Sequence, residues 1–323
     1  GHRARSSDFL RSISVSQTVR RRRTRQTMYV LFGVLTSVAS STGIVLLNKL
    51  LFAHDDFTFP ATLTGWHLLI THGVLSAAIR LNVFQSKRLA RKYVVWFCVF
   101  DAAAMALQNL SLTYNTINFY QTCKLFTIPV TVIIERFAGQ AFPKASKMVS
   151  LALITCGVAL CTGANFNTNT IGVCVGLGAT IGSALVLVST SWLQKSQGLS
   201  SSQLLHNVAG IDGLLLAALG PFLDYHLSHR ILYKHYEWST RSLVLVGSTC
   251  ALAVIVNYVT FYLLGKISPI SYQVLGQTKT MMIYSAGYYI FDRKASAGVS
   301  VPGTSLAFTG CIMYAWTSSK SSG

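Results

Sequence analysis

The stretch MYVLFGVLTSVASSTGIVLLNKLLF, residues Met28–Phe52, decides the class of fold to which this chain belongs. It holds a single charged residue, Lys49, near its end. A helix needs about 20 mostly apolar residues to cross the hydrocarbon core of a bilayer, and this run is long enough. A membrane-spanning barrel strand would be about half as long and would alternate in polarity. The stretch therefore predicts a transmembrane helix.

Similar apolar runs recur along the chain and predict an all-α membrane protein with ten transmembrane helices. The ten runs are Met28–Phe52, Phe59–Leu81, Tyr93–Leu112, Ile117–Phe137, Met148–Gly163, Gly172–Leu193, Leu204–Leu223, Leu243–Leu264, Ile270–Phe291 and Gly298–Trp316. Composition agrees, because charged residues make up 11% of the 323 residues, where a soluble protein would carry roughly a quarter.

The net charge of +18 does not indicate a nucleic-acid partner, because the basic residues flank the apolar runs. With the amino terminus in the cytosol, nineteen lysines and arginines fall on that side and five on the other. This asymmetry predicts cytosolic amino and carboxyl termini. The cluster Arg20–Arg23 is placed to contact anionic membrane lipids. Residues 1–27 are rich in Ser and Arg, which predicts a disordered cytosolic tail or, alternatively, an organelle transit peptide.

A weak internal repeat divides the rest of the chain into halves, residues 28–163 and 164–319. The fourth run contains Phe119-Tyr120-Gln121 and then Lys124, and the ninth contains Ser271-Tyr272-Gln273 and then Lys279. Five helices in a half is an odd number, so the second half must enter the membrane inverted. Secondary transporters with inverted repeats bind their substrate where the repeats meet.

Lys124 and Lys279 are the strongest candidates for a substrate site, because a charge near the middle of a membrane helix costs roughly 2.5–3.5 kcal/mol on insertion scales. Matching positions in two repeats predict a shared site for an anion. The alternative is that each lysine pairs with Asp101, Asp212 or a backbone carbonyl. If the lysines are unpaired in the empty carrier, we expect that carrier to change conformation poorly.

Polar and aromatic side chains around these lysines are further candidates for contact with a base or a sugar, or alternatively for helix–helix bridges. They are Tyr120, Gln121, Tyr272, Gln273 and Gln277, together with Asn48, Lys49, Thr64, His67 and Asn257 in other runs. Lys49 has the alternative of reaching to the membrane interface. For His67 the alternative is a histidine that bridges two helices. The glycine pairs Gly172/Gly176 and Gly178/Gly182 predict close helix packing.

Nothing in the sequence indicates an enzyme or a cofactor. There is no Gly-rich phosphate loop, HExxH or nucleophile elbow. Asp101 and Asp212 are expected to be isolated acids, not a paired general acid and base. The seven cysteines lie within apolar runs and show no metal-site spacing, as expected of packing residues.

Several short motifs, taken in order, resemble the nucleotide-sugar and triose-phosphate translocators of the drug/metabolite transporter superfamily. They are Asn48-Lys49, Thr62-Leu63-Thr64-Gly65-Trp66-His67, Gln108-Asn109-Leu110-Ser111-Leu112, Asn118-Phe119-Tyr120-Gln121 with Lys124, Gly220-Pro221-Phe222-Leu223-Asp224, and Ser271-Tyr272-Gln273-Val274-Leu275-Gly276 leading to Lys279-Thr280. The resemblance covers residues 28–317. It implies exchange of a nucleotide sugar for a nucleoside monophosphate, with the phosphates held by Lys124 and Lys279.

The pair Lys279-Thr280 is similar to plant-type UDP-galactose, UDP-rhamnose and UDP-xylose transporters. Plastid phosphate translocators have Lys-Arg there, and GDP-mannose carriers have Gly-Ala-Leu-Asn-Lys. The resemblance thus implies a UDP-sugar antiporter of the Golgi or endoplasmic reticulum that returns UMP. A plastid-type sugar-phosphate translocator and a scaffold with a transporter fold remain alternatives. The oligomeric state stays open, a homodimer included.

Overall fold

The computed structural model describes residues 2–54, 56–115, 117–162, 170–290 and 301–320, and these form helices joined by short connections. The helices are α1 (His2–His54), α2 (Pro60–Arg80), α3 (Arg91–Tyr114), α4 (Ile117–Phe137), α5 (Ala145–Thr162), α6 (Thr170–Ser196), α7 (Ser201–Ser228), α8 (Leu232–His235), α9 (Thr240–Lys266), α10 (Pro269–Ile290) and α11 (Val301–Lys320). Within these residues there is no strand, so the all-α prediction is confirmed.

Each predicted apolar run corresponds to one long helix, and α8 is an additional short helix. Five of the described helices are long and apolar enough to cross a membrane over Thr24–Phe52, Arg91–Ser111, Thr170–Ser196, Ser201–Ser228 and Thr240–Lys266. A shorter apolar stretch covers Ala145–Gly157. The arrangement as ten spans in two inverted halves stays a prediction.

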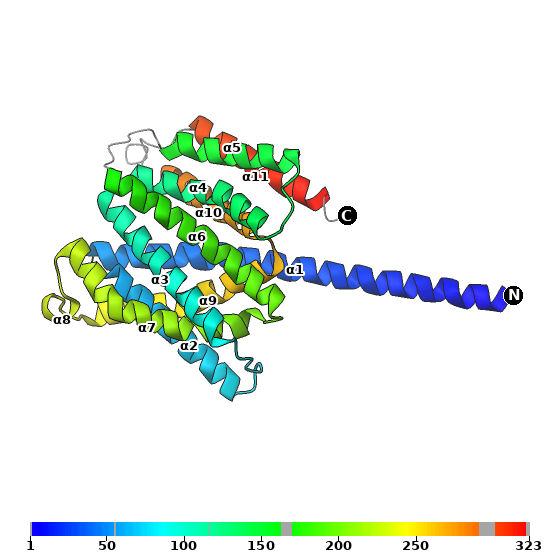
Figure 1. The fold of residues 1–323 in the computed structure, drawn as a ribbon, viewed down its shortest axis with the longest axis horizontal. Helices are drawn as coiled ribbons and strands as arrows, with labels where there is room; N and C mark the ends of the chain where they lie inside the picture. The colour runs from blue at the N-terminus through cyan, green and yellow to red at the C-terminus, as the bar shows by residue number, and fades with distance from the viewer. Residues whose placement is uncertain (1, 55, 116, 163–169, 291–300, 321–323) are drawn as a thin grey trace.

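Helix α1 is longer than its apolar run. It continues back to His2, through the segment for which composition predicts disorder, and its first half projects from the bundle (Figure 1). The described end of α11 lies toward the same side as this projection, and α8 lies at the opposite end (Figure 1). Both termini therefore point the same way, whereas their assignment to the cytosol stays a prediction.

Local sequence signals explain where several helices begin and end. Pro60 opens α2, where a missing N–H costs nothing. Ser200 with Gln203, and Ser239 with Ser242, form reciprocal capping boxes at the starts of α7 and α9. His229 ends α7 in the left-handed conformation.

Antiparallel helix pairs with small residues between them form the flanks of the bundle. Helices α5 and α11 lie along one flank and α2 and α7 along the other, with α4, α6 and α3 between them (Figure 1). At Gly65 on α2 an added Cβ would lie 2.7 Å from the backbone nitrogen of Ala217 on α7. The predicted packing role of Gly178 and Gly182 is confirmed, since they face Leu107 and Ala104 on α3.

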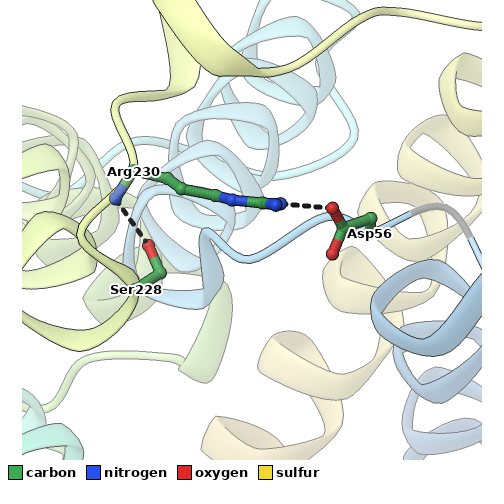
Figure 2. Close-up of polar contacts among 3 residues, drawn as sticks. All are labelled: Asp56, Ser228 and Arg230. Carbon is green, nitrogen blue, oxygen red and sulfur yellow. Dashed lines mark hydrogen bonds and ion pairs between the residues drawn. The ribbon is translucent and has the colours of Figure 1, made fainter.

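The end of the bundle that carries α8 is closed by three kinds of contact. Phe57 packs against Phe59, Trp66, Tyr236 and Trp238 in an aromatic cluster. The guanidinium of Arg230 pairs with the carboxylate of Asp56 (Figure 2). The backbone N–H of Arg230 donates to Ser228 Oγ at 3.3 Å.

The third contact is made by the fully buried Asp224 near the end of α7. Its carboxylate accepts the backbone N–H groups of Ala61 and Thr62, both at 2.9 Å, and the Thr62 hydroxyl at 2.6 Å. Asp224 therefore caps α2 from another helix.

Candidate substrate-binding site

Lys279 lies near the middle of α10 and contacts hydroxyl groups of α1. Its ammonium group donates to Ser37 Oγ at 2.7 Å and to Ser41 Oγ at 3.3 Å, and Ser37 is only 3% exposed. The sequence allowed a carboxylate as the partner of this lysine. In the structure, its hydrogen-bond acceptors are two neutral hydroxyl groups instead. Two neutral hydroxyls stabilise the charge without neutralising it, so an anion would gain from binding here.

The ring of Tyr272 extends the site along the same face of α10. Its centroid lies 5.8 Å from Lys279 Nζ, as expected for residues seven apart on one helix. The phenol oxygen is hydrogen-bonded to Thr260 Oγ1 on α9 at 2.9 Å, which fixes the ring in place. Gln277 is 8% exposed and Gln273 is half-buried on the neighbouring turns.

Lys124 lies on α4, which packs against α10, but its described surroundings differ from those of Lys279. It lines a recess between α3, α4 and α6 that also contains the polar side chains of Gln108, Thr180 and Ser183. Gln108 Nε2 donates to Ser183 Oγ at 3.0 Å there, and Thr180 Oγ1 donates to the Cys123 carbonyl at 2.9 Å. The contacts place Lys279 against α1 and Lys124 against α3 and α6. A single anion site that uses both lysines therefore stays a prediction.

Two candidates from the sequence bridge α2 and α9. His67 Nε2 lies 3.1 Å from Thr249 Oγ1, and the imidazole is buried. Asn257 Nδ2 donates to Thr71 Oγ1 at 3.1 Å. The structure therefore gives both residues the helix–helix contact that the sequence left open as the alternative.

The remaining candidates lie at other places. Thr64 Oγ1 donates to the Pro60 carbonyl at 2.8 Å within its own helix. Asn48 has a buried Oδ1 atom with no hydrogen-bond partner among the described atoms. The side chains of Lys49, Tyr120, Gln121 and Thr280 lie outside the described part of the structure, so their roles stay predictions.

The structure brings together two acids that are 111 positions apart in the sequence. Asp101 on α3 and Asp212 on α7 face each other inside the bundle, and the Cys98 thiol lies beside Asp212. Asp212 is 2% exposed. The expectation that these acids are isolated is therefore wrong. Helical spacing could not reveal the pair, because it lies between helices.

The sequence does not predict Ser37 and Ser41 as partners of Lys279. The one available signal is the segment Thr36–Thr42, in which five of seven residues carry a hydroxyl within an otherwise apolar run. Hydroxyl-rich turns in membrane helices commonly bond their own backbone carbonyls, as Ser40 Oγ does with the Thr36 carbonyl at 2.7 Å. The segment alone therefore did not identify Lys279 as its partner.

Comparison with known proteins identifies the family. The model of the triose-phosphate transporter family matches residues 29–315. UDP-xylose transporter 1 of Arabidopsis thaliana is 34% identical over 296 residues, which cover 91% of this chain and 86% of that protein. UDP-rhamnose/UDP-galactose transporter 2 of the same plant is 32% identical over 284 residues, 87% of this chain and 80% of that protein.

A solved crystal structure shares the fold. It superposes with a TM-score of 0.68 at 12% identity, over 91% of this chain and 99% of the other. The resemblance found from the short motifs is confirmed, and the expectation that the chain is not an enzyme agrees with its relatives. This multi-pass membrane protein belongs to the triose-phosphate transporter family.

Proposed function

We propose that this protein carries a UDP-sugar across a Golgi or endoplasmic-reticulum membrane in exchange for UMP. The observation that carries the proposal is Lys279, a cation in the middle of α10 whose partners are the neutral Ser37 and Ser41. A phosphate group could replace these hydroxyls as a charged acceptor, which would add Coulombic attraction between opposite charges to the hydrogen bonds. The names of the Arabidopsis relatives support a UDP-sugar as the substrate.

The packing partners of the helices support an inverted repeat, with α1–α5 as one half and α6, α7, α9, α10 and α11 as the other. Exchanging the halves makes α1 equivalent to α6, α3 to α9 and α4 to α10. The contact between α1 and α9 then corresponds to the contact between α6 and α3, and both pairs pack together. Likewise, the contact between α10 and α1 corresponds to the contact between α4 and α6, and these pairs also pack together. Each lysine helix thus packs against the first helix of the opposite half, as expected of alternating access between related halves.

The bound nucleotide would use the groups around Lys279. The ammonium group would bind the phosphate, and the Tyr272 ring would pack against the base or the sugar. Lys124, Gln273 and Gln277 would complete the site as hydrogen-bond donors. Among the undescribed side chains, we assign the same role to Tyr120, Gln121 and Thr280.

The proposal is tested with purified protein in liposomes preloaded with UMP. We expect uptake of radiolabelled UDP-galactose, UDP-rhamnose or UDP-xylose into preloaded vesicles and not into empty ones. Lys279→Ala should abolish uptake, whereas Lys266→Ala, which removes an exposed lysine at the end of α9, should leave it intact. Equal uptake into empty vesicles would contradict exchange.

A plastid-type exchange of phosphorylated sugars is the second candidate, because the matching family model is that of triose-phosphate transporters. Competition in the same vesicles separates the two candidates. Inhibition by triose phosphate and not by any UDP-sugar would favour the second.

A further inference from the structure

A cavity among the described residues is separate from both lysine sites. It has a volume of about 470 Å³ and lies among the ends of α4 and α6, the starts of α5 and α10 and the last turns of α11. Pockets for small ligands usually measure roughly 300–1,000 Å³. By the basic-residue asymmetry, this is the side predicted to face the cytosol.

The walls of the cavity carry groups that suit a nucleotide. Lys147 and Lys195 supply positive charge, and the indole of Trp192 supplies an aromatic wall. On the side of α10, the hydroxyls of Ser268, Ser271 and Tyr314 form a chain with separations of 3.0 and 3.1 Å. Cations, an aromatic ring and hydroxyl groups match the phosphate, base and ribose of a nucleotide.

One acid also lines the cavity. Glu135 at the end of α4 is half-buried and attracts Lys195 electrostatically. The ionisable lining is therefore two lysines against one glutamate. A phosphate that reaches Lys195 must compete with the carboxylate of Glu135, so the acid should weaken anion binding.

The cavity lies in line with the lysines deeper in the bundle. Glu135 follows Lys124 by eleven residues on α4, and Ile270 precedes Lys279 by nine on α10. At 1.5 Å per residue, these offsets are about 16 and 14 Å along the two helices. Both lysines thus lie at a similar depth beyond the same cavity.

We propose that this cavity is an outer docking site where the phosphate of a nucleotide first binds to Lys147 and Lys195, with its base against Trp192. The inference rests on the proposed function, since it supplies the entry step for the same substrate. Glu135 lowers the affinity of this step, because its carboxylate attracts Lys195 and repels a phosphate.

The first test measures the KM for UDP-sugar in sealed microsomes, whose outer face is cytosolic, after subtraction of uptake by host vesicles. We expect Lys147→Gln and Lys195→Gln each to raise KM about threefold to fivefold, as for one partly screened charge, with little change in maximal rate. Glu135→Gln should lower KM. The control Lys144→Gln removes an exposed lysine directly before α5 that does not line the cavity. An unchanged KM in all three cavity variants would overturn the proposal.

The second test reads the cavity without transport. A thiol introduced by Ser196→Cys lies in the cavity wall and should react with a membrane-impermeant reagent more slowly when UMP is present. Labelling of the native cysteines in the unmodified protein is subtracted, and uridine, which lacks the phosphate, is the ligand control.

The two tests separate the outer site from the transport function. Protection by UMP without any exchange would refute the proposed function and keep the docking site. A lack of protection by UMP would overturn the docking site, even if exchange were intact. Protection by phosphatidylserine vesicles, and not by UMP, would assign the cavity to a lipid headgroup and also overturn the proposal.

Discussion

Replacing Asp224 by Ala should destabilise the bundle more than removing the exposed ion pair between Asp56 and Arg230, which lies at the same end of the bundle. The carboxylate accepts three hydrogen bonds from Ala61 and Thr62, at 2.9, 2.9 and 2.6 Å, and is fully buried. Without it, two N–H groups and one hydroxyl lose their partner at a buried helix end.

The size of the loss follows from these contacts. Each unsatisfied buried donor costs about 1–3 kcal/mol, so three donors set an upper bound of about 9 kcal/mol. The variant also no longer buries a carboxylate, which recovers several kcal/mol. Loss of a helix cap alone typically costs about 0.5–2 kcal/mol. We therefore expect Asp224→Ala to lower the free energy of unfolding by about 2–4 kcal/mol.

Thermal unfolding in detergent measures the effect, with a thiol-reactive dye that reports exposure of the buried Cys98, Cys123, Cys250 and Cys311. The matched control is Asp56→Ala, which removes an acid at the same end whose side chain is 71% exposed. A surface ion pair contributes about 0–1 kcal/mol, so this control should melt near the unmodified protein. Equal losses in the two variants would refute the capping role of Asp224.

Three further predictions concern the interior. The double variant Ser37→Ala/Ser41→Ala should lower the melting temperature of the empty protein, because Lys279 then lacks the hydroxyl groups that accept its hydrogen bonds. The same variant should show a larger rise in melting temperature when UMP is added. An unchanged response to UMP would contradict this. His67→Ala should cost about 1 kcal/mol of stability in thermal unfolding while leaving the KM for UDP-sugar unchanged, since its contact is with Thr249; a raised KM would make it a ligand residue instead. Gly157→Val should lower the yield of folded protein on size exclusion far more than Gly73→Val, because a side chain at Gly157 would collide with the backbone of Ala307, whereas Gly73 faces open space. Comparable yields would mean that α5 and α11 separate easily.

Helix positions could be predicted from the sequence because they depend on local composition. The run Ile117–Phe137 has the same bounds as α4, and Ile270–Phe291 begins one residue after the start of α10. Membrane helices must satisfy their own backbone hydrogen bonds, so a long apolar run has few alternatives. Helix α8 was missed because four residues carry no periodic signal.

Contacts between helices could not be predicted in the same way. The neighbours Asp101 and Asp212 come from different helices, as do Lys279 and its partners on α1. Helical spacing orders the residues on one face of a helix, as it did for Tyr272 and Lys279, but it does not say which helix that face meets. The sequence therefore predicted Lys279 as a site residue and left its partner open.

The partners of Lys279 change the physical explanation of the proposed exchange. The hypothesis that an unpaired lysine holds back the empty carrier does not fit this residue, because Ser37 and Ser41 already accept its hydrogen bonds. These hydroxyls belong to α1, so a phosphate that displaces them also removes contacts between α10 and the opposite half. Substrate binding and helix movement are then coupled through the same two hydrogen bonds. Under the proposed exchange, we expect the empty carrier to resist movement because α10 is bound to α1, and either exchanged nucleotide would release it.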